Sequence, residues 1–141
     1  CYIGETKGKI AGYCWIVRNK FYIYQIDHAI NLEPTDLYFY NAYVLKKYRR
    51  YDVMKGNILA VRRDLIPQGF NREIIAIMNW NNPSRQFALK MGFEEAGSIT
   101  TGYVLTFRYT INTCKHLNFS SEAGVLDFYR RLFNKFKSLI N

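Results

Sequence analysis

The sequence predicts a mixed α/β fold, with a mostly antiparallel sheet, flanking helices and an added helix at the C-terminal end. Three observations predict this class. Runs rich in β-branched and aromatic residues dominate the first third of the chain. Two segments with helical spacing follow, separated by a short apolar run typical of a strand. The 141 residues, 49% of them hydrophobic, suit a single domain with a substantial core.

The N-terminal segment is expected to form a hairpin. Its strands cover Cys1–Gly4 and Ile10–Val17, and Gly8 in the turn between them supplies the positive φ that a tight turn needs. Phe21–Ile26 is a further β-rich run.

The strongest strand signal is Leu37–Leu45, after a loop over Leu32–Asp36. It is rich in aromatic residues on both faces, as expected of a central strand. Strict alternation places Leu37, Phe39, Asn41, Tyr43 and Leu45 on one face and Tyr38, Tyr40, Ala42 and Val44 on the other.

Two helices follow this strand. Met54, Ile58, Val61 and Leu65 have helical spacing, and Pro67 predicts that the first helix ends near Leu65. The second helix is predicted to begin with Pro83 in its first position, to run to Met91 and to end at Gly92, with strands predicted over Glu73–Met78, Glu94–Ile99 and Gly102–Thr110.

The C-terminal part is expected to be a helical extension. A polar connection over Lys115–Ser121 precedes a predicted amphipathic helix over Glu122–Ile140. We therefore divide the chain into a core over residues 1–112 and an extension over 113–141. The apolar stripe of that helix comprises Val125, Phe128, Leu132, Phe136 and Leu139.

Two blocks of sequence point to a known family. Residues 43–55 (YVLKKYRRYDVMK) are a strand running through a basic loop into a helix. Residues 81–97 (NNPSRQFALKMGFEEAG) are a helix that starts at Asn, ends in Gly-Phe and precedes an acidic pair. Over residues 37–96 the chain resembles the GNAT superfamily of N-acyltransferases. The resemblance implies this fold over roughly residues 1–109, without the family's first strand and the helices that follow it.

The first block implies a binding site for acetyl-CoA or another acyl-CoA. A helix N-terminus offers unpaired backbone N–H groups and partial positive charge, which can hold a pyrophosphate. In the family, the preceding strand end pairs with the pantetheine arm. The donor-binding residues that the resemblance implies are Val44, Leu45, Arg49, Arg50, Tyr51, Asp52, Val53, Met54, Lys55 and Asn81.

The phosphate loop departs from the family pattern. Asp52 and Met54 stand where the family has glycine. In one interpretation Arg49, Arg50 and Lys55 supply enough positive charge to keep the site. In the other, the carboxylate of Asp52 caps the helix and occupies the anion site itself. The sequence leaves both open.

The catalytic groups also depart from the pattern. The family's usual helix tyrosine, which protonates the departing thiolate, is Ala88 here. The central strand carries no carboxylate, and Asp36 lies just before it. Asn41 can orient a water but cannot accept a proton at neutral pH. Asn41, Tyr43 and Ser84 remain the candidate catalytic residues.

Composition limits the other options. Cys1, Cys14 and Cys114 lack metal-ligand or disulfide spacing, so we expect no metal and a reducing, cytoplasmic setting. No run of residues approaches the length of a membrane span. Trp15 and Trp80 are expected to pack in the core.

The first hypothesis for function is an N-acyltransferase that moves an acetyl or longer acyl group from acyl-CoA, or an acyl carrier, to a small-molecule or peptide amine. The second is a non-catalytic module of the same fold that binds acyl-CoA or another anion. The third is association with nucleic acid through the net charge of +9. The C-terminal helix has three alternatives: packing on the sheet, covering a substrate groove, or forming the seam of a homodimer.

Overall fold

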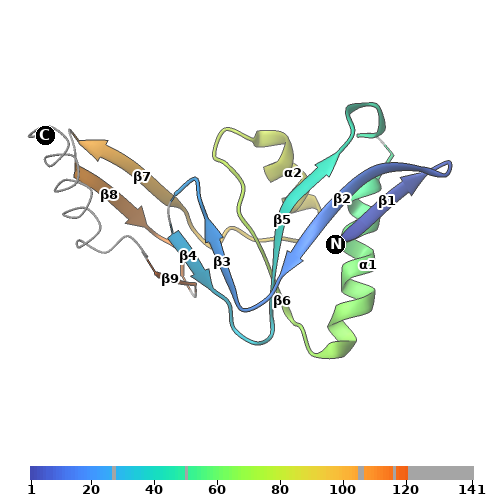
Figure 1. Ribbon diagram of the computed structural model, residues 1–141. Coiled ribbons are helices and arrows are strands. Elements are labelled where there is room, and N and C mark those ends of the chain that lie inside the picture. The colour runs from blue at the N-terminus through green and yellow to red at the C-terminus, as the bar shows by residue number, and fades with distance from the viewer. Residues whose placement is uncertain (27, 50, 105–106, 116, 121–141) are drawn as a thin grey trace, which may run out of the picture. The chain divides into compact units, whose positions relative to one another are not determined.

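The computed structural model describes residues 1–26, 28–49, 51–104, 107–115 and 117–120. These residues form nine strands and two α-helices (Figure 1). They divide into two compact units, which are described separately. The first unit comprises Cys1–Asn19 and Leu32–Glu95, and the second comprises Lys20–Asn31 and Ala96–Asn141.

The first unit is built on a four-stranded sheet. Its spatial order is β1-β2-β5-β6. The β1–β2 and β2–β5 pairs are antiparallel, whereas β5 and β6 are parallel and connected through a helix. The strands are β1 (Tyr2–Thr6), β2 (Lys9–Val17), β5 (Asp36–Val44) and β6 (Arg72–Ile75).

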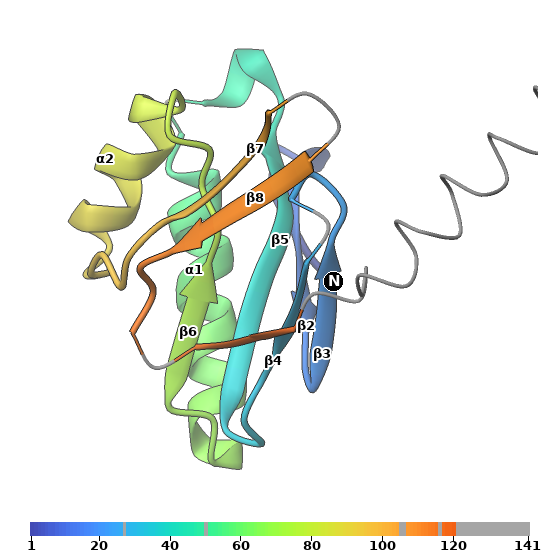
Figure 2. The same ribbon diagram turned by 90° about the vertical axis from the view of Figure 1, so that its left-hand side faces the viewer.

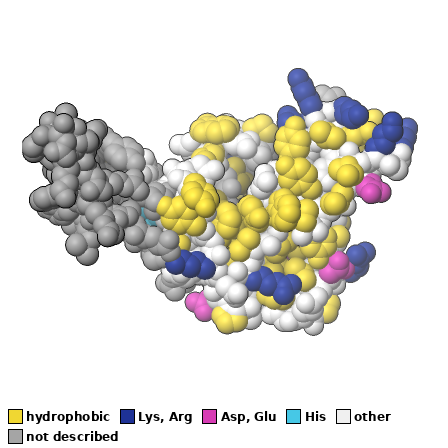
Figure 3. Space-filling view, viewed as in Figure 1, with side chains coloured by type: hydrophobic (Ala, Val, Ile, Leu, Met, Phe, Trp, Pro, Cys, Tyr) yellow, Lys and Arg dark blue, Asp and Glu magenta, His cyan; other side chains and the backbone are white. Residues whose placement is uncertain are grey.

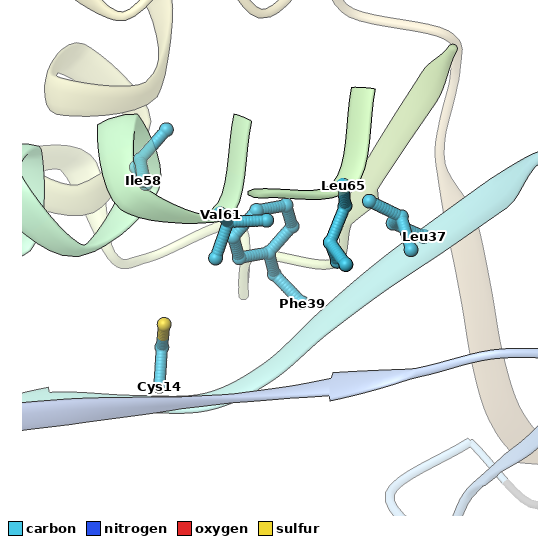
Figure 4. Close-up of a cluster of buried hydrophobic side chains, with 6 residues drawn as sticks. All are labelled: Cys14, Leu37, Phe39, Ile58, Val61 and Leu65. Atoms are coloured by element: carbon cyan, nitrogen blue, oxygen red, sulfur yellow. The ribbon is translucent and has the colours of Figure 1, made fainter. Parts of the chain in front are cut away.

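Helix α1 (Val53–Leu65) covers one face of this sheet. Its apolar stripe meets the inward side chains of β2 and β5, because residues three and four apart share one face of a helix. The close-up in Figure 4 shows the resulting core. The buried cluster consists of Cys14, Leu37, Phe39, Ile58, Val61 and Leu65.

The predicted end of α1 is confirmed, whereas the second helix begins and ends one residue earlier than predicted. Helix α1 ends at Leu65, and a short 3-10 turn that contains Pro67 follows it. Helix α2 (Asn82–Lys90) begins one residue before Pro83. Gly92 has a φ of 87°, the left-handed conformation expected of a glycine after a helix.

The second unit contains a three-stranded sheet in the order β3-β4-β9 and a separate hairpin of β7 and β8. All of its strand pairs are antiparallel. The strands are β3 (Lys20–Ile23), β4 (His28–Asn31), β7 (Ile99–Val104), β8 (Phe107–Asn112) and β9 (Asn118–Ser120).

Three predictions fail in the second unit. The strand expected over Glu94–Ile99 is wrong, because β7 begins only at Ile99. The segment from Gly102 to Thr110 is divided between β7 and β8, where Gly102 pairs with Tyr109. The polar connection contains β9, whose pairing with β4 uses backbone groups and needs no apolar alternation. The predicted helix over Glu122–Ile140 lies outside the described residues.

Candidate functional site

The middle of β5 contains a β-bulge. On β2, Tyr13 pairs with Tyr43 and Trp15 pairs with Tyr40, so Cys14 alone lies opposite two residues of β5. The first of those two, Asn41, has a φ of 46°. One extra residue on one strand, with an unusual backbone conformation, defines a bulge and bends the strand locally.

The bulge reverses the side-chain alternation of β5. Tyr40 packs against Trp15 with ring centroids 6.2 Å apart, and Tyr43 packs against Tyr13 at 6.1 Å. Trp15 and Tyr13 are two residues apart on β2 and share a face. Tyr43 therefore lies on the face of Tyr40, opposite α1.

The predicted grouping of Tyr43 with Leu37 and Phe39 is therefore wrong. Val44, paired with Gly12, faces α1 instead: a Cβ added at Gly12 would lie 3.1 Å from both Val44 Cγ2 and Val53 Cγ1. Strict alternation could not reveal this, because the prediction assumed a strand without an inserted residue.

Strands β5 and β6 separate at the bulge. Their parallel pairing runs from Asp36 and Arg72 to Phe39 and Ile75. Figure 2 shows β6 ending well before β5 does. Within the described residues, no strand pairs with β5 on that side beyond Phe39. A strand edge without a neighbouring strand is a place where an extended ligand can pair with the backbone.

Helix α1 begins next to the end of this free edge. Asp52 is its N-cap residue, as expected, but its side chain accepts no hydrogen bond from the helix. The predicted capping by the Asp52 carboxylate is therefore wrong. Side-chain caps normally come from residues with extended backbone angles, whereas Asp52 has φ 53° and ψ 20°.

The left-handed backbone conformation of Asp52 accounts for the preference of the family pattern for glycine at this position. A left-handed residue is easiest for glycine, and aspartate and asparagine are the side chains that tolerate it best. The loop therefore adopts a backbone conformation at Asp52 that glycine would also allow. The N–H groups of the first helical turn, which lack partners inside any helix, are not used by this side chain.

Basic side chains surround this helix start. Arg49 donates a hydrogen bond from Nε to the backbone oxygen of Val44, 3.3 Å away, which ties the loop to the end of β5. Tyr51 and Lys55 are exposed. The first turn of α1 contains no acidic residue. Arg50 lies outside the described residues, so its predicted role remains a prediction.

The second block supplies the start of α2. Asn81 is the N-cap of this helix, and its Oδ1 accepts a hydrogen bond from the backbone N–H of Ser84 at 3.3 Å. The two polar candidates of this block therefore lie together. Ala88 is only 6% exposed and packs in the core. No proton donor replaces the family's tyrosine at that position.

Asp36 has a structural role. Its side chain is 1% exposed, and both of its oxygens accept hydrogen bonds from Arg72, at 2.7 and 2.6 Å. The backbone N–H of Glu33 donates a further bond at 2.8 Å. Asp36 opens β5 at the end opposite Val44. Its carboxylate holds β5 and β6 together and is not placed to act as a base near the bulge.

Sequence reasoning missed an apolar hollow on the sheet face opposite α1. Its volume is about 390 Å³. Trp15 was expected to pack in the core but is 41% exposed at this hollow, and Trp80 is 76% exposed elsewhere. In the sequence, the only sign of this hollow was the aromatic content of the two strands that form β2 and β5. The lining residues are Cys1, Ile3, Ile10, Tyr13, Trp15 and Asn41.

The described part of the chain offers neither a cluster of metal ligands nor a membrane-spanning helix. No group of three or more His, Cys, Asp or Glu side chains there is arranged to hold a metal ion. None of its helices has the length and apolar character needed to cross a membrane.

The splayed parallel pair, the bulged central strand and the basic helix start together define an acyltransferase-type α/β fold. The model of the acetyltransferase (GNAT) family matches residues 1–93, and the chain belongs to this family. No curated protein matches the sequence.

One solved structure with this fold is AAC(6')-Iy in complex with the bisubstrate analogue CoA-S-monomethyl-acetylneamine. It matches with a TM-score of 0.57 at 22% sequence identity. The match covers 72% of this chain and 66% of that chain, slightly less than two thirds of its length. The likeness confirms the mixed α/β class with its mostly antiparallel sheet.

Proposed function

We propose that the chain is an N-acyltransferase that moves an acetyl or longer acyl group from acyl-CoA, or an acyl carrier, to an amine. One observation carries this proposal. The side chain of the N-cap residue leaves the first turn of α1 free, and this turn lies near the end of β5, which has no described partner strand on the β6 side. A phosphate-bearing donor with an amide-containing arm needs these two features side by side.

The donor's phosphates would lie at the backbone N–H groups of Val53, Met54 and Lys55. The charges of Arg49 and Lys55 favour such an anion, because charge-assisted hydrogen bonds are about twice as strong as neutral ones. The arm would extend along the free edge of β5 toward the bulge. Leu45, Tyr51, Asp52 and Asn81 complete the proposed site, with Val44 at the strand end; Arg50, outside the described residues, stays a member predicted from the sequence.

The chemistry would then take place at the bulge. The amine nitrogen attacks the thioester carbonyl, the carbon–sulfur bond breaks, and the thiolate takes up the proton that the new amide loses. Asn41, Tyr43 and Ser84 are the polar side chains proposed to orient the reactants. Positioning can supply about 7–11 kcal/mol of the barrier reduction. The general acid–base assistance that Ala88 cannot give is worth roughly 10²–10⁴-fold.

A non-catalytic module that binds acyl-CoA is the second candidate. Ala88 favours it, because a buried methyl group replaces the acid that the family normally uses. Tight donor binding without turnover, for any amine tested, would support this candidate over the first. For either candidate, the three free cysteines suit a reducing compartment, which we propose is the cytoplasm.

Calorimetric titration with acetyl-CoA, followed by an assay of thiol release with a broad panel of amines, tests the proposal. We expect binding that weakens about fivefold in Lys55→Ala, since one cation near a phosphate is worth about 1 kcal/mol. Lys90→Ala is the matched control, because Lys90 is also an exposed cation and lies in the last turn of α2. Absence of both binding and thiol release in the folded protein would refute the proposal.

A further inference from the structure

Exposed cations surround the start of α1 in the first unit. Figure 3 shows Lys and Arg side chains gathered at the end of this unit where β5 leads into α1. Asp52 is the only acidic residue between Leu37 and Arg63. Such a one-sided distribution of charge attracts and orients an anionic partner. Four of the exposed cations form what we call the basic rim: Lys46, Lys47, Arg49 and Lys55.

The cations of the basic rim form no ion pair within the described residues. The Nε of Arg49 donates to a neutral group, the backbone oxygen of Val44, and its charge stays uncompensated. The other described arginines that pair with carboxylates lie outside the rim. These ion pairs are Arg62–Glu73, Arg63–Asp64, Arg72–Asp36 and Arg85–Glu95. The charge of the rim is therefore available to a partner molecule.

Two tyrosines hold part of the basic rim in place. Lys47 Nζ lies 4.9 Å from the centroid of the Tyr48 ring, and Tyr48 meets Tyr51 edge to face with ring centroids 6.1 Å apart. Tyr51 is itself 61% exposed. Exposed tyrosine is enriched in protein–protein interfaces. A cation already fixed over a ring also loses less freedom when a partner binds. The rim therefore suits a protein surface.

The start of α1 discriminates between donors by their charge. Coenzyme A bears a pyrophosphate and a further phosphate, whereas a phosphopantetheine arm attached to a carrier protein bears a single phosphodiester. Asp52 is the N-cap residue, and its carboxylate repels a bound anion in proportion to the charge of that anion. It therefore disfavours coenzyme A more than a carrier arm. Lys46 and Lys47 lie in the 3-10 turn before the loop, where they are left for an acidic protein surface.

We infer that the acyl donor is borne by an acidic carrier protein, which docks on the basic rim and extends its phosphopantetheine arm along the free edge of β5. This inference rests on the proposed function and names its donor. The transfer itself is unchanged. The amine nitrogen attacks the thioester carbonyl, the carbon–sulfur bond breaks, and the thiolate of the arm takes up the proton that the new amide loses. The carrier then leaves with a free thiol.

Three donors that share one reactive end test the inference. An acetylated bacterial acyl carrier protein, acetyl-CoA and acetyl-phosphopantetheine are each offered to the folded chain with the same panel of amines. The kcat/KM for amide formation is measured by mass spectrometry. We expect the carrier to exceed both small donors about tenfold at low salt, and this advantage to shrink as salt screens the exposed charges. An equal or lower kcat/KM with the carrier overturns the inference.

Charge reversal on the basic rim separates docking from chemistry. Lys46→Glu and Lys47→Glu should each weaken calorimetric binding of the carrier about fivefold, and the double variant more than about tenfold. The kcat/KM with acetyl-phosphopantetheine should stay within about twofold of the parent, because this small donor does not reach an exposed protein-docking surface. Lys90→Glu is the matched control, since it changes the net charge equally at an exposed position in the last turn of α2. Undiminished carrier binding by the double variant contradicts the inference.

The outcomes distinguish this inference from the proposed function. If acetyl-CoA yields amide while the carrier neither binds nor reacts, the transferase proposal stands and the inference is wrong. If the carrier binds through Lys46 and Lys47 but no donor yields amide, the rim is a docking surface for the carrier and the transferase proposal is wrong. Single-stranded RNA with the net charge of the carrier is the competitor. If this RNA binds as tightly and depends on the same lysines, the rim is a general polyanion surface and the inference is overturned.

Discussion

Asp52→Gly is the most informative single substitution in the proposed donor site. It removes a carboxylate from the start of α1 and places glycine in a left-handed conformation, φ 53° and ψ 20°. The carboxylate makes no capping hydrogen bond that the change would remove. The substitution therefore alters two quantities, the local charge and the backbone preference, and leaves the helix contacts in place.

The expected size of each effect follows from simple electrostatics and backbone sterics. A pyrophosphate at the first-turn amides would lie about 6 Å from the carboxylate, where each repulsive charge pair costs about 0.7 kcal/mol in water. Two phosphate charges, screened by physiological salt, leave about 1 kcal/mol, or about a fivefold gain in affinity. Relief of the left-handed strain is largely offset by the added flexibility of glycine in the unfolded chain, so stability should change by less than about 1 kcal/mol.

Calorimetry of acetyl-CoA binding at low and high salt measures the charge effect, which should shrink as salt increases. Asp52→Asn is the matched control, because asparagine has the same shape, tolerates the same backbone angles and carries no charge. Both variants should bind about fivefold more tightly than the parent. If neither gains affinity, the donor's phosphates do not lie at this helix start and our placement of the site is refuted.

Four further predictions concern stability and reactivity. Asp36→Ala should lower the free energy of unfolding by about 3 kcal/mol in urea titrations, since alanine cannot accept the hydrogen bonds that Arg72 and the Glu33 N–H donate to the buried carboxylate; a loss below 1 kcal/mol would contradict this. Asn57→Leu should raise it by about 1 kcal/mol, because the buried Nδ2 of Asn57 has no hydrogen-bond partner. Gly12→Ala should destabilise by about 1–3 kcal/mol, with the new Cβ 2.7 Å from a backbone oxygen, whereas Gly56→Ala, with open space around it, should stabilise by up to about 1 kcal/mol. Burial raises the pKa of Cys14 to about 11, so at pH 8 its thiol should resist alkylation until the chain unfolds, and rapid labelling of the native protein would disprove this.

The helices of the first unit follow from the sequence because their signals are local. Pro67 restricts the residue before it, and Gly92 adopts the left-handed angle after α2. The apolar spacing that ends at Leu65 also identified the side of α1 that meets the sheet. Each of these signals acts within one or two turns of chain, so tertiary context did not override it.

The features that the sequence did not predict depend on distant residues. The bulge at Asn41 exists relative to the register of β2, which ends at Val17, 24 residues earlier in the chain. β9 pairs with β4 from almost 90 residues away. The hollow forms only when β1, β2 and β5 lie side by side. Of the candidate site, the basic loop and its helix could be predicted, whereas the apolar hollow could not.

The bulge also determines how β5 must be aligned with related strands. The inward–outward alternation of side chains before Asn41 is out of step with the alternation after it. A sequence alignment that assumes one alternation along the whole strand will therefore misplace one half by one residue. Deletion of the single codon for Asn41 would restore one phase throughout. Ala42 would then take the place of Asn41, while Tyr43 would stay on the face of Tyr40 and Val44 on the face of α1. A point substitution leaves the inserted residue in the strand and therefore cannot restore this regular alternation.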